Sequence, residues 1–119
     1  MANTGPIRPH STRTSEAPWN GSASESKLGD ASPGTMRREF AWVDAGADPD
    51  NKGSYKFPHH EVTASGGVGA ANMRACISGI GVLNGGRGGA RIPKADRRRI
   101  YVHLARHLRD GGHEPPALE

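Results

Sequence analysis

The chain has few of the residues that build a large hydrophobic core. Of its 119 residues, 34% are hydrophobic and 5% aromatic, whereas 17 are glycine and 9 are proline. A chain of this size that is partly unstructured can bury only a modest apolar surface. The composition therefore predicts one small domain with long flexible segments.

Disulfides and membrane-spanning segments are not expected either. Cys76 is the single cysteine, so no intrachain disulfide can form. No stretch approaches the roughly 20 apolar residues that a membrane span needs. Residues 1–36 lack the apolar run of a signal peptide. We therefore expect a soluble cytoplasmic protein with no membrane partner.

Positive charge is concentrated near the end of the chain. The formal net charge is +4, and residues 37–62 lean acidic. Between Gly86 and Asp110 only Asp96 opposes a group of basic residues. The group consists of Arg87, Arg91, Lys94, Arg97, Arg98, Arg99, Arg106 and Arg109. Such a two-sided charge distribution favours association with an acidic partner.

Residues 1–36 are rich in Ser, Thr, Gly, Ala and Pro, with three basic and three acidic residues. Such a segment buries too little apolar surface to offset the entropy of ordering. We predict a largely flexible N-terminal tail that docks, if at all, through Trp19, with a short helical turn at SASESKL.

Residues 37–112 are predicted to form a small α+β domain, and residues 113–119 a C-terminal tail. Alternation in EFAWVD and SYKF predicts a two-stranded antiparallel hairpin around a polar loop. Apolar spacing predicts a helix over residues 68–84 and a second one between Pro93 and Gly111. The expected core consists of Trp42, Tyr55, Phe57, Ile77, Ile80, Ile100, Leu104 and Leu108.

Histidine is the residue type most suggestive of a site. His103 and His107 are four residues apart on one predicted helix, which places both rings on one side. His59, His60 and Cys76 could complete a tetrahedral zinc site. However, HLARH lacks the glutamate of the HExxH metalloprotease motif, and there is no CxxC. We therefore favour packing or hydrogen-bonding roles for these histidines and predict no metal or other cofactor.

The sequence gives less support to calcium binding, phosphate binding or nucleophilic catalysis. DPDNKG matches an EF-hand loop at its first, third and sixth positions but fails at the fifth and twelfth. GGRGGARIP lacks the Gly-Lys-Ser/Thr of a phosphate-binding loop. Cys76 falls on the buried face of a predicted helix, where a thiol is usually inert. We predict no catalytic residue and no small-molecule substrate.

Four segments together resemble a domain found in or beside the prohead (capsid maturation) proteases of actinobacterial phages and prophages. They are RPHSTRTSEAPWNGSASES, FAWVDAGADPDNKGSYKFPHHEV, VGAANMRACISGIGVLNGGRGGARIP and ADRRRIYVHLARHLRDGGHEPPAL. The resemblance implies a part in phage head assembly and head-assembly proteins as partners. It does not imply protease activity, because no catalytic Ser–His arrangement of the protease portion matches this chain.

Two functions are therefore expected. The first is a non-enzymatic interaction or scaffold module of a phage head, in the host cytoplasm or in the virion. The alternative is a small nucleic-acid-binding module, since arginines near a helix start can contact phosphates. In either case the partner surface is predicted to contain Arg87, Arg91, Arg97, Arg98 and Arg99.

Overall fold

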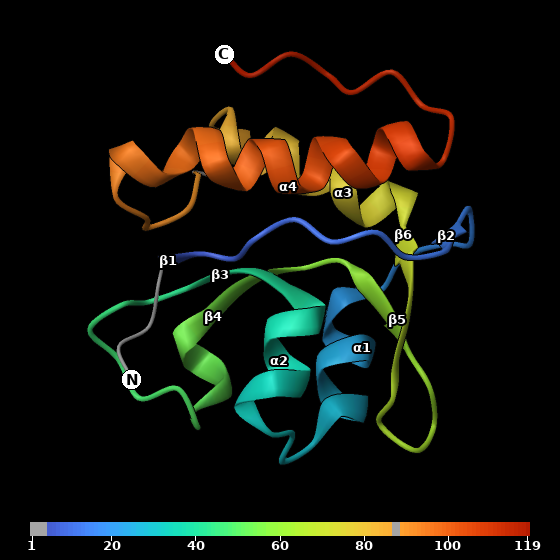
Figure 1. The fold of residues 1–119 in the computed structure, drawn as a ribbon, viewed down its shortest axis with the longest axis vertical. Helices are drawn as coiled ribbons and strands as arrows, with labels where there is room; N and C mark the ends of the chain where they lie inside the picture. The colour runs from blue at the N-terminus through green and yellow to red at the C-terminus, as the bar shows by residue number, and fades with distance from the viewer. Residues whose placement is uncertain (1–4, 87–88) are drawn as a thin grey trace.

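The structure, a computed structural model, describes residues 5–86 and 89–119. It confirms a mixed α+β fold. Two small three-stranded sheets replace the single predicted hairpin. Figure 1 shows the strands between two layers of helices, with α1 and α2 on one side and α3 and α4 on the other.

The first sheet contains the predicted hairpin. Its strands are β1 (Gly5–Pro6), β3 (Phe40–Val43) and β4 (Tyr55–Pro58), antiparallel in the order β1-β3-β4. The polar loop between β3 and β4 ends in a short 3-10 helix at Lys52–Ser54. The hairpin is thus confirmed, but an N-terminal strand extends it into a sheet.

The second sheet was not predicted. It has the order β2-β6-β5, with β2 (Thr14–Ser15) parallel and β5 (His60–Val62) antiparallel to the central strand β6 (Val68–Asn72). The predicted helix over residues 68–84 is therefore wrong at its beginning. The helix α3 spans Met73–Leu83, because the Asn72 side chain accepts the Ala75 N–H and caps it there.

The N-terminal segment is part of the fold rather than a separate tail. It contains α1 (Gly21–Leu28), capped by Asn20, and the start of α2 (Pro33–Glu39), capped by Ser32. Ile7, Leu28 and Met36 are buried, whereas Trp19 is only half-buried. The prediction that Trp19 would be the docking residue overlooked these aliphatic side chains, which pack with Phe40 and Tyr55.

The core divides into two clusters, one on each side of β3 and β4. Seven of the eight predicted core residues are buried, but Ile77 is 42% exposed and was wrongly assigned. Tyr55 packs with the cluster that includes Ile7, and Phe57 with the cluster around α3 and α4. Phe57 has a φ of 65°, so the strand does not keep the regular alternation that the sequence suggested.

The last helix crosses above both sheets. A short 3-10 helix (Lys94–Asp96) leads into α4 (Arg97–Asp110), which ends at Gly111 as predicted. Asp96 anchors its start by accepting the indole N–H of Trp42 at 2.9 Å. The C-terminal tail then runs back along the outer side of α4, where the Tyr101 hydroxyl donates to the Pro116 carbonyl.

Candidate metal centre

Five of the six histidines gather at the place where the two sheets meet beneath α4. The chain passes from the first sheet to the second twice, once between β1 and β2 and once between β4 and β5. His10 lies on the first passage, His59 lies on the second, and His60 is the first residue of β5. His103 and His107 come from α4. These five residues are called the histidine cluster below.

The cluster is tightly packed and mostly inaccessible. His59, His60, His103 and His107 are fully buried, and His10 is half-buried. One ring nitrogen from each of His10, His59, His103 and His107 lies within 4.8 Å of the others. His60 joins the group through His10, because their Nε2 atoms are 3.2 Å apart. The structure thus brings together all four histidines that the sequence singled out and adds His10.

Backbone carbonyls fix the protonation of three rings. The Nδ1 atom of His59 is 2.9 Å from the Phe57 carbonyl, and that of His103 is 2.7 Å from the Ile7 carbonyl. The Nδ1 atom of His60 is 2.8 Å from the carbonyl of Gly69. A carbonyl can only accept, so each Nδ1 carries the proton and donates. In a neutral ring this leaves Nε2 with a free lone pair.

Two of these lone pairs face each other. The Nε2 atoms of His59 and His103 are 3.1 Å apart. Neither can donate while both rings are neutral, so the contact is repulsive without a cation between them. A protonated ring would place a charge in the buried interior, which is costly. A metal ion satisfies both lone pairs, and donation from the other ring nitrogen is the usual support of a metal-bound histidine.

His107 provides an independent observation. Both of its ring nitrogens are buried and have no hydrogen-bond partner, among the groups that the structure describes. Its ring centroid lies 5.0 Å from those of His59 and His60 and 5.2–5.3 Å from those of His10 and His103. A buried polar group without a partner costs about 1–3 kcal/mol. Metal ligation would give one of these nitrogens a partner.

The electrostatics keep the cluster neutral. Burial lowers the pKa of His60 and His103 to about 4 and that of His107 to about 3. Burial, reinforced by the neighbouring rings, lowers the pKa of His59 well below its usual value, and burial together with Arg38 lowers the pKa of His10. Neutral imidazole is the form that binds metals, so the ligands need not lose protons near pH 7.

Glu39 holds the His59–His60 backbone in place. The His60 N–H donates to the Glu39 carboxyl at 3.0 Å, and the His59 N–H donates to the Glu39 carbonyl at 3.0 Å. The other carboxyl oxygen is also buried, and no group in residues 5–86 or 89–119 forms a hydrogen bond with it. Burial raises the pKa of Glu39 to about 8, so the group is mostly protonated at neutral pH. Glu39 therefore acts on the cluster through the backbone.

Cys76 does not belong to the cluster. It is buried in the apolar cluster around α3 and α4, and burial raises the pKa of its thiol to about 12. The thiolate that would bind a metal or attack a substrate is therefore disfavoured. The candidate ligand set consists of histidine nitrogens alone.

The arginines that were predicted to form the partner surface differ in their exposure to solvent. Arg91, Arg98 and Arg99 are exposed. Arg97 is half-buried and donates to the carbonyls of Leu83 at 2.8 Å and Glu119 at 2.9 Å, so it anchors the C-terminal tail. Arg87 lies outside the described residues.

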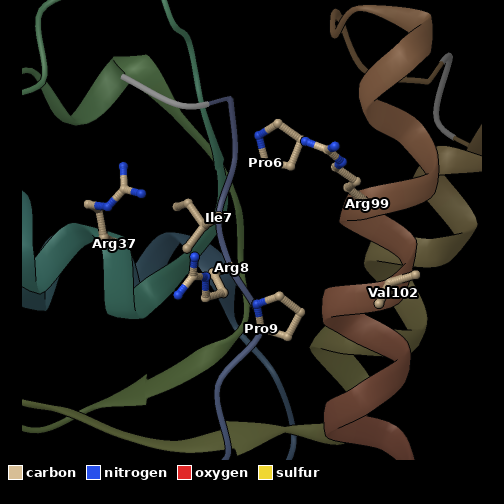
Figure 2. A pocket seen from close by; sticks show the side chains of 7 residues that line it. All are labelled: Pro6, Ile7, Arg8, Pro9, Arg37, Arg99 and Val102. Atoms are coloured by element: carbon tan, nitrogen blue, oxygen red, sulfur yellow. The ribbon is translucent and has the colours of Figure 1, made fainter. Parts of the chain in front are cut away.

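Arg99 lines a groove between the N-terminal segment and α4. The groove has a volume of about 530 Å³, and Figure 2 shows Arg99 extending from α4 toward Pro6. Its remaining lining residues are Ile7, Arg8, Pro9, Arg37 and Val102. Arg91 lines a different hollow, beside Trp42 and Asp96. Arg91 and Arg99, both predicted to belong to one partner surface, therefore line different hollows.

Comparison with known protein families, with curated proteins and with solved structures finds no match. In the part of the chain that the structure describes, no helix has the length and apolar character needed to cross a bilayer. The function is therefore inferred from the residues of this chain.

Proposed function

We propose that the chain is a non-enzymatic assembly module of a tailed-phage head, and that a metal ion bound by the histidine cluster cross-links its tertiary structure. The observation that carries the metal site is the facing pair of Nε2 lone pairs on His59 and His103, both imposed by backbone carbonyls. Imidazole nitrogens suit zinc, copper, iron and nickel.

A structural role fits the surroundings of the centre better than a catalytic one. Catalytic zinc sites typically use three protein ligands and keep one position for water or substrate, whereas structural sites are closed by protein ligands. Here at least four histidine nitrogens converge, and three of the rings that supply them are fully buried. The metal would join the N-terminal segment, the β4–β5 junction and α4.

The phage assignment is supported by the resemblance of the four sequence segments quoted above, which span nearly the whole chain. Within that proposal the module acts in the host cytoplasm or the virion and binds another head-assembly protein. A direct test is sedimentation of the purified chain with the prohead protease and the major capsid protein from the same genome. Absence of association with both proteins would contradict the phage role and leave the metal site unaffected.

The metal site has its own test. The purified chain should contain about one metal ion, measured by inductively coupled plasma mass spectrometry, and a strong chelator should lower its melting temperature. His103→Asn should reduce the metal content, because asparagine can still donate to the Ile7 carbonyl but cannot supply Nε2. His113→Asn is the matched control, since His113 lies outside the cluster and pairs with Glu16. Equal metal content in both variants would contradict the site.

Nucleic-acid binding is the alternative function, favoured by the exposure of Arg98 and Arg99 at the start of α4. Phosphate contacts release counterions, so such binding weakens steeply with salt. Titration of duplex and single-stranded DNA at low and moderate salt distinguishes the two proposals. No binding at low salt would exclude this alternative.

A further inference from the structure

The groove between the N-terminal segment and α4 is lined by arginines and aliphatic side chains. Its volume of about 530 Å³ falls in the range of roughly 300–1,000 Å³ that is usual for binding clefts. All of its charged lining residues are arginines, namely Arg8, Arg37 and Arg99. Figure 2 shows Arg37 on α2 and Arg99 on α4, with residues 6–9 passing between the two helices. This hollow is called the arginine groove below.

Two of its arginines are accessible to a partner. Arg8 and Arg99 are exposed, and neither forms an ion pair with a carboxylate of residues 5–86 or 89–119. Val102, which lines the same groove, is 45% exposed. Arginines beside an exposed aliphatic side chain suit an occupant that is acidic and carries small apolar side chains.

A protein segment fits the arginine groove better than a nucleic acid does. Single-stranded nucleic acids are typically bound by stacking of their bases on aromatic side chains. The uncharged residues that line this groove are Pro6, Ile7, Pro9 and Val102, all of them aliphatic. The groove therefore offers charge and apolar contact but no platform for a base.

The loop between β3 and β4 has the complementary composition. Residues 44–51 read DAGADPDN, so aspartates are interspersed with alanine, glycine and proline. Asp48 and Asp50 are exposed. Figure 1 shows this loop at the edge of the molecule, and none of its residues lines the arginine groove of its own chain. The acidic loop, residues 44–51, is thus available to the groove of another copy.

The acidic loop is held in shape by its own hydrogen bonds. The Ala47 N–H donates to the Asp44 carbonyl at 3.1 Å. The Asn51 N–H donates to the Asp48 carbonyl at 3.1 Å, which makes a second turn. The Asp48 carboxylate accepts the Asp50 N–H at 2.9 Å and, with about four acceptor sites, can also accept from a guanidinium. A loop that is ordered beforehand loses little conformational entropy on binding.

We propose that the chain associates with itself head to tail, so that the acidic loop of one copy binds in the arginine groove of the next. Guanidinium groups pair with carboxylates through two parallel hydrogen bonds, and Asp48 and Asp50 provide the carboxylates for Arg8 and Arg99. The two surfaces differ, so association continues into a ring or an open chain of copies. This inference goes beyond the proposed function and depends on neither the metal site nor the phage assignment.

Sedimentation equilibrium of the purified full chain tests the association. At low salt the average mass should rise above that of the monomer as the protein concentration increases. Added salt should weaken the association, because exposed charges are screened. Arg8→Glu with Arg99→Glu should weaken it by about tenfold or more, since like charges then face each other.

Two further variants make the test specific. Arg74→Glu with Arg109→Glu is the matched control, because it makes the same change in net charge at two exposed arginines that do not line the groove. It should associate like the parent. Asp48→Asn with Asp50→Lys reverses charge on the loop but keeps a side-chain acceptor at position 48, and should also abolish association.

Mixing the groove variant with the loop variant is the decisive measurement. The mixture contains an unchanged groove on one chain and an unchanged loop on the other, so it should associate although neither variant does so alone. Melting temperatures near that of the parent would show that both variants fold, as expected for substitutions of exposed side chains.

The outcomes either support or overturn the head-to-tail contact. Association that each variant loses and the mixture regains supports it. A parent chain that stays monomeric at low salt would overturn it, as would association that survives either variant or a mixture that remains monomeric. If the parent is monomeric and Arg8→Glu with Arg99→Glu removes binding to DNA, the groove is a nucleic-acid site and the proposal is wrong.

Discussion

The Nε2 atoms of His59 and His103 lie 3.1 Å apart, while the Nδ1 of each ring faces a backbone carbonyl. Replacing His59 with asparagine should therefore have opposite effects in the two states of the chain. Without metal, the variant should be as stable as the parent or more stable, because the facing lone pairs are gone. With metal, it should lose most of the gain in unfolding free energy that the parent shows. Urea unfolding with and without added nickel measures both effects, and equal metal stabilisation in variant and parent would contradict the pairing.

Acid should destabilise the metal-free chain. The folded-state pKa values of His60 and His103 are lowered to about 4 and that of His107 to about 3, against about 6.5 in the unfolded chain. The unfolded state therefore binds more protons below about pH 6.5, and stability should fall from there toward pH 4. Arg106 beside His107 acts in the same direction. Thermal melts at pH 7, 6 and 5 test this.

Bound metal should shift the acid-induced loss of stability to lower pH, because metal ligation competes with protonation of the histidines. A melting temperature that does not change between pH 7 and 5 in the metal-free chain would contradict burial of neutral histidines.

Shortening a buried side chain near the histidine cluster should lower the free energy of unfolding. Phe57→Ala or Leu104→Ala should lower the free energy of unfolding by about 2–5 kcal/mol, because both side chains are buried and leave cavities. Ile77→Ala on α3 is the control, since its side chain is 42% exposed and its loss should cost about 0.5 kcal/mol or less. Chemical denaturation measures all three, and similar values for Ile77 and Leu104 would contradict the packing.

Substitutions of the three consecutive arginines of α4 should differ in their effect on the melting temperature. Arg98→Glu with Arg99→Glu should leave the melting temperature nearly unchanged, because both side chains are exposed. Arg97→Glu should lower it, because the guanidinium donates to Leu83 and Glu119. If the Arg98–Arg99 pair contacts a partner, the double variant should weaken that association while Arg97→Lys does not. Unchanged association would show that the pair is simply a solvated surface.

The N-terminal segment should be required for metal binding. A chain beginning after His10 should bind metal weakly and melt at lower temperature, since it loses a ligand, the Ile7 side chain and the carbonyl that orients His103. His10→Asn separates these contributions because it removes only the ligand. Full metal affinity in the truncated chain would contradict the role assigned to this segment.

The sequence predicted the elements with strong local signals. The hairpin and the last helix follow from alternation, from helical spacing and from Gly111. The spacing of His103 and His107 and the adjacency of His59 and His60 likewise mark four of the cluster residues. Their convergence could not be predicted, because it depends on how β4, β5 and α4 cross in space.

His10 was missed for a different reason. It lies in a segment whose composition suggests flexibility, and it has no neighbouring histidine in the sequence. The segment is held by a few long-range contacts, such as Ile7 in the core and the pairing of Thr14 with Ala71. Pairing of short strands across the chain leaves little trace in local composition.

The two passages between the sheets carry a consequence for folding. His10 and His107 lie near opposite ends of the sequence, and His59 lies near its middle. If all three bound one ion, the ion would close two long loops of the chain. The single cysteine forms no intrachain disulfide that could close such loops. Closing such loops removes entropy from the unfolded chain, a stabilisation that grows slowly with loop length. No single helix or hairpin contains enough of these residues to hold the ion. The chain would therefore bind metal tightly only after α4 has packed against the segments that connect β1 to β2 and β4 to β5. The rate of metal binding would then report the last step of folding.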